Sequence, residues 1–276
     1  IFTLGSYSMT FNHPDRLFPS DTFTRGLARE LFENIETLPI ISPHGHCDPS
    51  WFSENKRFPD PAQLFVVPDH YVFRMLVSQG LTLNELGVQT LDGSVFENDP
   101  QKIWKKFSEN YYLLRGTPTA MWLDYSFEKV FGISEPLTPL NSDFYFNHIE
   151  EKLSQPEFLP RALFDKFNIE TLATTDAALS ELSDHQNIKS CTWDGRIIPT
   201  YRPDSVIDPD NIEFKNNLRI LGELTDNDTC SWDGYLKAHK SRRLFFKEMG
   251  ATASDHGHPT ARTENLSYTH AEQLFN

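Results

Sequence analysis

The sequence predicts an α/β protein built on parallel strands. Its last third alternates short apolar stretches with helical ones, an order typical of a parallel sheet joined by right-handed crossovers. Each expected strand ends in a cluster of polar residues, and parallel folds build their sites at the carboxyl ends of their strands. A helical middle third separates the first expected strand from the others.

The first segment, residues 9–50, is expected to hold one helix and the first strand. Asp21 can cap the helix. The apolar positions that follow recur every four residues and form a stripe on one face: Phe23, Leu27, Leu31 and Ile35. The run "LPIIS" then predicts a short buried strand, because an apolar run closed by Pro43 is too short for a core helix.

The second segment, residues 51–165, is expected to be a helical insertion. It contains helical stretches separated by Gly and Pro punctuation such as "RGTP", with no period-2 strand between them. The third segment, 166–276, carries the remaining expected strands and helices. Its strands are "IETLATTD", "RIIPTYRPD" and the strand end "ATASDHGHP".

Bulk properties narrow the class of protein. With 25 basic and 39 acidic residues the formal charge is −14, so the surface should repel nucleic acid and anionic membranes. No stretch approaches the roughly 20 apolar residues of a membrane helix, and the N-terminus lacks the order of a secretory signal. The three cysteines are far apart and form no CxxC pair. We therefore expect a cytoplasmic protein with neither nucleic-acid nor membrane partners.

The segment "PHGHCDP" is a candidate metal site. On a strand, residues i and i+2 point to the same face, so His44 and His46 could present two imidazoles to one ion, with Gly45 leaving room between them. Two imidazoles suit Zn, Mn, Fe or Ni, and two ligands do not select among these ions. For an isolated pair, two hydrogen-bonded loop histidines are the commoner explanation. The other polar strand ends favour the metal.

Further polar clusters follow the later strands or start a helix. Thr175 and Asp176 end one expected strand, Arg202 and Asp204 end the next, and Asp255, His256 and His258 end the last. A structural salt bridge is the alternative for Arg202 with Asp204. Asp255 and His256 are neighbours, so they diverge if the strand continues, and then only one of them faces the site.

Two candidates lie outside the strand ends. In "PDHYVFRML", His70 and Tyr71 could bind a polyhydroxy acid or move a proton, since a neutral imidazole and a phenol both donate and accept. A helix start capped by Asp69 explains the same residues equally well. Arg161 could hold a carboxylate through two parallel hydrogen bonds, although most single arginines are only solvated.

Together these segments resemble the uronate isomerases, also called glucuronate isomerases, a branch of the amidohydrolase superfamily of metal-dependent (β/α)8 barrels. The segments that carry the resemblance are "ISPHGHCDP", "FPDPAQLFVVPDHYVFRMLVSQG", "YLLRGTP", "WLDYSFEKVFGI", "RALFDKFNIETLATTD", "PTYRPDSVIDP" and "MGATASDHGHPTART". They occur in order from about residue 14 to 275. The chain resembles the N-terminal half of the family, with about the first four barrel strands and a helical insertion after strand 1.

The resemblance implies an aldose–ketose isomerase that converts D-glucuronate to D-fructuronate and D-galacturonate to D-tagaturonate. It implies one divalent ion on His44 and His46, with zinc expected first and Mn, Fe or Ni as alternatives. The catalytic residues that we expect are Tyr71, Asp204 and His256. The substrate-binding residues that we expect are His70, Arg161, Arg202 and Asp255.

The family's later motifs do not occur in the sequence, among them the final Asp-Thr-Arg segment that resembles the source of the third metal ligand. A small hexuronate is the expected partner, and a homo-oligomer is an open alternative to a monomer. Two rival functions remain at this stage: a metal-dependent hydrolase on the same barrel, and an inactive fragment that folds only with a partner chain.

Overall fold

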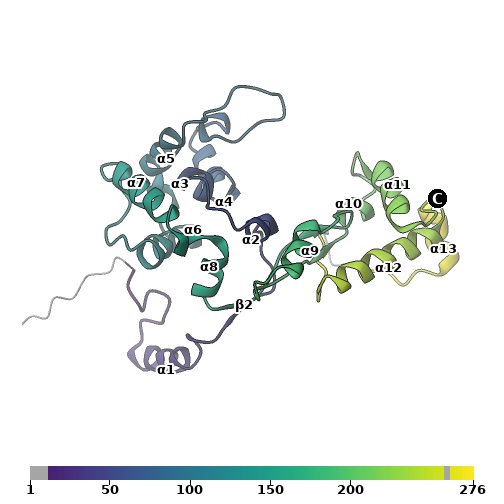
Figure 1. The fold of residues 1–276 in the computed structure, drawn as a ribbon, viewed down its shortest axis with the longest axis horizontal. Helices are drawn as coiled ribbons and strands as arrows, with labels where there is room; N and C mark the ends of the chain where they lie inside the picture. The colour runs from purple at the N-terminus through teal and green to yellow at the C-terminus, as the bar shows by residue number, and fades with distance from the viewer. Residues whose placement is uncertain (1–11, 258–261) are drawn as a thin grey trace, which may run out of the picture. The chain divides into compact units, whose positions relative to one another are not determined.

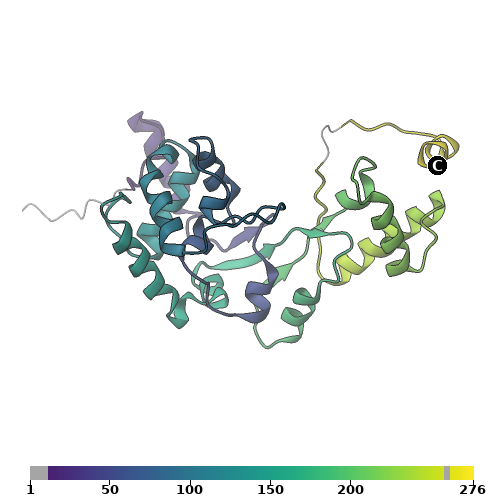
Figure 2. The same ribbon diagram turned by 90° about the horizontal axis from the view of Figure 1, so that it is seen from above.

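The computed structural model describes residues 12–257 and 262–276 (Figure 1; Figure 2). The chain divides into two compact units. Unit 1 combines the segment up to Leu38 with Arg57–Ala162, and unit 2 combines Pro39–Lys56 with Leu163–Asn276. None of the helices in the described residues is long and apolar enough to span a membrane.

Helix α1 (Thr22–Glu33) begins where the sequence predicts it. The Asp21 carboxylate accepts a hydrogen bond from the Thr24 backbone N–H at 2.7 Å, which satisfies one of the free donors of the first turn. The apolar stripe is present but solvent-exposed: the exposed fraction is 76% for Phe23 and 70% for Leu31. Capping and periodicity define this helix, and the segment before it contacts it through Phe18, whose ring meets Phe32 edge to face, and through Asp15, which pairs with Arg29.

Helices supply the regular structure of residues 57–162 (Figure 1). The α-helices are α3 (Pro61–Phe65), α4 (His70–Val77), α5 (Pro100–Glu109), α6 (Pro118–Tyr125) and α7 (Ser142–Leu153). Short helical turns join them: η1 (Asn84–Leu86), η2 (Tyr111–Leu114), the π-helical η3 (Ser126–Val130) and η4 (Pro156–Phe158). Within the described residues the predicted helical, strand-free character of this stretch is confirmed.

The core of unit 1 forms where α5 packs against α3 and α7. Trp104 and Phe107 of α5 are fully buried, and Phe127 meets Tyr145 edge to face with ring centroids 5.2 Å apart. The Trp104 indole donates a hydrogen bond to the Ser142 carbonyl at 3.1 Å, so the large ring is buried without an unsatisfied donor.

Unit 2 contains parallel strands that neighbour one another in chain order. β1 (Ile40–Ser42), β2 (Ile169–Ala173) and β4 (Arg196–Ile198) form one parallel sheet, with β2 in the middle. β3 (Asp176–Ala177) and β5 (Tyr201–Arg202) pair in parallel, and Tyr201 forms a parallel bridge with Ser254. The predicted parallel α/β arrangement is confirmed for these strands.

The prediction that "LPIIS" forms a buried strand is confirmed for the strand and wrong for its burial. β1 forms, but Ile40 and Ile41 have exposed fractions of 49% and 62%. β1 pairs with β2 alone among the described strands, so it lies at an edge of the sheet. An apolar run indicates that a strand prefers to be covered, whereas burial depends on which elements reach it.

The remaining helices belong to unit 2, apart from α8, which spans the boundary between the units. They are α2 (Pro49–Glu54), α8 (Pro160–Lys166), α9 (Ser183–Ser190), α10 (Asp204–Ile207), α11 (Phe214–Thr225), α12 (Trp232–Glu248) and α13 (Tyr268–Phe275). One buried cluster joins Phe52 and Ile188 to Leu172 and Ile197 of the sheet. Helices α2 and α9 thus cover part of β2 and β4.

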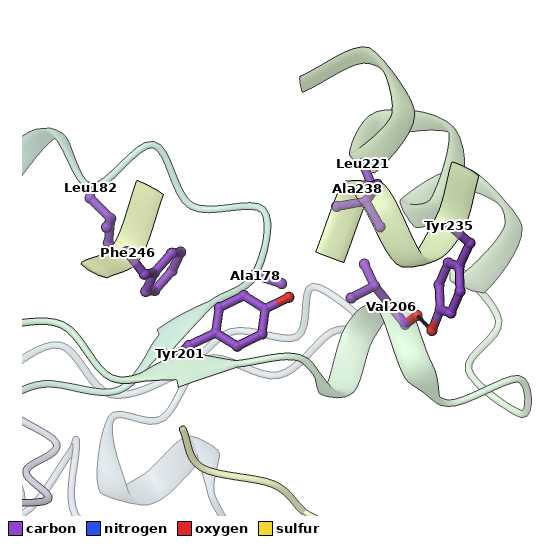
Figure 3. Packing of buried hydrophobic residues seen from close by; sticks show 8 residues of the cluster. All are labelled: Ala178, Leu182, Tyr201, Val206, Leu221, Tyr235, Ala238 and Phe246. Atoms are coloured by element: carbon purple, nitrogen blue, oxygen red, sulfur yellow. Dashed lines mark hydrogen bonds between the residues drawn. The ribbon is translucent and has the colours of Figure 1, made fainter. Parts of the chain in front are cut away.

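A second cluster packs α12 against β5 (Figure 3). The Tyr201 ring meets Phe246 edge to face at 5.0 Å, and the Tyr235 hydroxyl donates to the Val206 carbonyl at 2.9 Å. His239 is buried beside them, with its Nδ1 atom 3.0 Å from the Tyr201 hydroxyl oxygen. Burial, together with the charge of Arg243, lowers the pKa of His239 from 6.5 to about 4.

We predict that His239 makes unit 2 less stable in mild acid. The folded state holds the imidazole neutral, so its stabilisation is complete above pH 6.5 and is lost as the pH falls towards 4. Between pH 7.5 and pH 5, the unfolding free energy should fall by about 2 kcal/mol less in His239→Gln than in the original chain. Urea unfolding of both chains at each pH measures this difference. Equal falls in the two chains would contradict it.

Candidate functional site

The ends of the strands in unit 2 lie close together because their backbones stay paired. The Thr200 N–H donates to the Thr174 carbonyl at 3.0 Å, and the Asp255 N–H donates to the Tyr201 carbonyl at 3.0 Å. These bonds fix the register of three segments: the one after β2, the one after β4 and the one that contains Ser254. Polar residues far apart in the sequence therefore gather at the carboxyl edge of the sheet.

The Asp255 carboxylate joins two of these endings. Its Oδ2 atom lies 3.0 Å from His44 Nε2 and 2.9 Å from an Arg202 guanidinium nitrogen. The hydrogen bond from His44, together with the positive charge of Arg202, lowers the pKa of Asp255. An ionised carboxylate only accepts hydrogen bonds, so His44 Nε2 carries the proton in this arrangement.

The two histidines of "PHGHCDP" lie just beyond the strand, not on it, which corrects the predicted placement. β1 ends at Ser42, and Pro43 has no N–H with which to continue the ladder. The rings of His44 and His46 nevertheless lie side by side, with centroids 5.1 Å apart and planes at 72°. The two rings are therefore close although the strand has already ended at Ser42.

Gly45 is required by the backbone behind the histidines. A Cβ atom there would lie 2.9 Å from the Ala173 carbonyl oxygen at the end of β2. The Thr175 hydroxyl reaches the same bend, 3.5 Å from His46 Nδ1. The glycine therefore lets the histidine bend lie against the end of the neighbouring strand, in addition to separating the two rings.

A buried polar cluster next to this edge was not predicted from the sequence. The Thr174 hydroxyl donates to Asp176 at 2.7 Å and lies 2.9 Å from His185 Nε2, on helix α9. Burial lowers the pKa of His185, which favours the neutral ring. Its sequence context, "LSDHQN", resembles an ordinary helix start, so no local signal identifies His185 as a core residue.

Arg202 and Asp204 do not form the salt bridge that was the alternative for this pair. Arg202 pairs with Asp255, while Asp204 Oδ1 accepts a hydrogen bond from the Gly257 backbone N–H at 2.6 Å. Arg202 and Asp204 thus both contact the segment "DHG". Neither the charge pattern nor the spacing indicates this partner, which lies 53 residues further along the chain.

His256 points differently from its neighbour. Its Nε2 atom lies 3.1 Å from the Ser254 hydroxyl, and the residue lines a cavity of about 240 Å³ beside Tyr201 and His239. Asp255 thus contacts His44 and Arg202, while His256 contacts other groups. His258, which the sequence places in the same cluster, lies outside the described residues.

Unit 1 carries the second group of predicted site residues. Asp69 accepts a hydrogen bond from the Tyr71 N–H at 2.8 Å and so caps α4, as the structural alternative requires. Both His70 and Tyr71 remain exposed, with ring centroids 4.3 Å apart. The Arg74 guanidinium lies 4.8 Å from the centre of the Tyr71 ring. Asp69 therefore caps the helix while His70 and Tyr71 still face solvent, so the structural and the functional explanation can both hold.

Arg161 lies in α8 and is partly buried. It belongs to unit 1, as do His70 and Tyr71. His44, Arg202 and Asp255 belong to unit 2. The structure thus brings together the unit 2 residues of the predicted site. The predicted roles of the unit 1 residues stay predictions.

The donor chemistry of the histidine bend fits a divalent ion in part. Imidazole nitrogen and carboxylate oxygen are ligands that zinc binds, and His44, His46 and Asp255 supply such atoms near one another. Over residues 12–257 and 262–276, however, no group of three or more His, Cys, Asp or Glu side chains could hold a metal together. The histidine pair therefore fits as part of a ligand set that needs further donors.

These observations define an α/β protein whose polar site lies at the carboxyl ends of parallel strands. A family model described as glucuronate isomerase matches residues 17–276. Curated uronate isomerases from Mesorhizobium japonicum and Rhizobium meliloti are 54% and 53% identical, over 263 and 262 residues. The chain therefore belongs to the glucuronate isomerase family.

Solved structures agree with this assignment. The glucuronate isomerase from Caulobacter crescentus matches 96% of the chain with a TM-score of 0.92 and 49% identity. The uronate isomerase from Thermotoga maritima matches with a TM-score of 0.85 and 26% identity. The match to the two curated relatives covers 95% of this chain but only 56% of the length of each relative.

We predict that replacing Gly45 with Ala destabilises unit 2 by about 1 to 3 kcal/mol, because the new methyl group would overlap a backbone oxygen that cannot rotate away. Gly26, on helix α1, is a matched control, since a Cβ atom there would meet nothing within 4 Å. Replacing it with Ala should stabilise the chain slightly. Thermal unfolding of both variants measures the contrast, and an equal effect of both would contradict the prediction.

Proposed function

We propose that this chain supplies the first half of an amidohydrolase-type (β/α)8 barrel. The parallel pairing of consecutive strands supports this, as do the helices between them and the match to relatives of nearly twice the matched length. In such a barrel the carboxyl ends of the strands form the active site. The cluster around Asp255 would then lie at the catalytic face.

We propose that the complete protein is an aldose–ketose isomerase of hexuronates, acting on D-glucuronate and D-galacturonate. The observation that carries the proposal is the contact of Asp255 with both His44 and Arg202, which joins two strand ends of the family's motifs into one site. The names of the relatives, uronate isomerase and glucuronate isomerase, support the substrate class.

The reaction moves a proton from C2 to C1 of the sugar and shifts the carbonyl group the other way. It needs a base near the C2 proton, an acid for the oxygen and a group that stabilises the developing negative charge. Tyr71 and His256 are the groups we assign to proton transfer, because a phenol and an imidazole can each donate and accept. Asp204 is the third group expected to orient or relay protons.

The substrate carboxylate requires cationic or hydrogen-bonding partners. Arg202 uses one nitrogen for Asp255, and a guanidinium has five N–H donors, so further donors remain for a ligand. We assign substrate binding to Arg202, Asp255, Arg161 and His70. The paired charges of Arg202 and Asp255 fix the guanidinium before a ligand arrives, which lowers the entropic cost of binding.

We propose that His44 and His46 hold one divalent ion, zinc first, with Mn, Fe or Ni as alternatives. The proton on His44 Nε2 would have to leave when that nitrogen ligates the ion. When bound, such an ion stabilises negative charge on a substrate oxygen. The further donors would come from outside the described residues.

The test uses a chain in which this sequence is followed by the remaining part of the Mesorhizobium japonicum relative. Supplied with zinc, it should form D-fructuronate from D-glucuronate. His44→Ala or His46→Ala should reduce turnover about a hundredfold or more, while His13→Ala, at an exposed position in unit 1, should not. Absence of ketose product with each of the four metals would refute the proposed function.

A further inference from the structure

The segment that carries Asp255 and His256 is attached at two points. Before Asp255, the backbone pairs with β5: the Tyr201 N–H donates to the Ala253 carbonyl at 3.3 Å, and the Asp255 N–H donates to the Tyr201 carbonyl at 3.0 Å. After His256, the Gly257 N–H donates to Asp204 Oδ1 at 2.6 Å. The two site residues therefore lie between a backbone attachment and a side-chain attachment.

The second attachment lies beyond the last ladder bond. β5 ends at Arg202, and Pro203 cannot donate to a neighbouring strand. The next carboxylate, Asp204 at the start of α10, accepts the N–H that the ladder no longer serves. A charged acceptor makes a short and comparatively strong hydrogen bond.

The glycine at position 257 is specific to this contact. A Cβ atom there would lie 2.6 Å from the same Asp204 Oδ1 atom that accepts the hydrogen bond. A larger residue there would therefore require the Asp204 carboxylate group to shift. Steric fit and hydrogen bonding thus select the same pair.

We propose that Asp204 and Gly257 form a latch that positions Asp255 and His256. The latch keeps the Asp255 carboxylate where it meets His44 and Arg202. Through its Oδ1 atom Asp204 then acts as a positioning residue, and the proton relay proposed above would need its other carboxylate oxygen. Only the bearing of the latch on catalysis rests on the function proposed above; the latch itself is a property of the folded chain.

The test measures hydrogen exchange of the Asp255 amide by NMR in the 276-residue chain. Asp204→Ala should speed exchange about tenfold, the loss expected for a hydrogen bond to a charged group. Asp204→Asn keeps an oxygen acceptor and should retain most of the protection. Gly257→Ala should match Asp204→Ala, and the double variant should be no worse than either, because both remove one contact.

Asp208→Ala is the matched control. This carboxylate follows the same short helix and, among the described residues, accepts a hydrogen bond from the nearby Asp210 N–H, so its loss should leave Asp255 exchange unchanged. Equal protection in the original chain and in Asp204→Ala would overturn the latch, as would equal loss in the Asn and Ala variants. These readouts need no turnover, so failure of the latch and failure of the isomerase proposal are separate results.

Discussion

The site in unit 2 depends on the carboxylate of Asp255. One oxygen of this residue accepts from His44, which follows β1, and from Arg202, which ends β5. The contact with His44 joins residues 211 positions apart. Without the carboxylate, the Arg202 guanidinium and the His44 imidazole would lose the negative charge that both contact. The pairing therefore fixes the histidine bend and the arginine in one place.

The backbone register makes this contact available. The segment 253–255 pairs with Tyr201, the segment after β4 pairs with the segment after β2, and Gly45 allows the histidine bend to approach β2 closely. Each strand is short, and single hydrogen bonds beyond the strand ends extend this order. Tyr201 packs against Phe246 (Figure 3), and its hydroxyl oxygen lies 3.0 Å from Nδ1 of the buried His239. The same residue thus connects the site to the core.

Much of the local structure was predictable because its causes are local. Asp21 caps α1, Asp69 caps α4, and the stretch 57–162 forms helices without a strand among its described residues. The family assignment was predictable from ordered motifs, since several segments in sequence are far more specific than one His-Gly-His. The prediction of a buried β1 was wrong, because periodicity reports what a residue prefers and not what covers it.

The sequence by itself determined the kinds of elements, the polar endings of the strands and the family. Only the tertiary structure decided which polar atoms meet: Arg202 with Asp255 and not with Asp204, Asp204 with Gly257, and His185 with Thr174. The physical reason is range. Caps, turns and periodicity act within a few residues, whereas these contacts depend on strand register and on close backbone approach between segments that folding brings together.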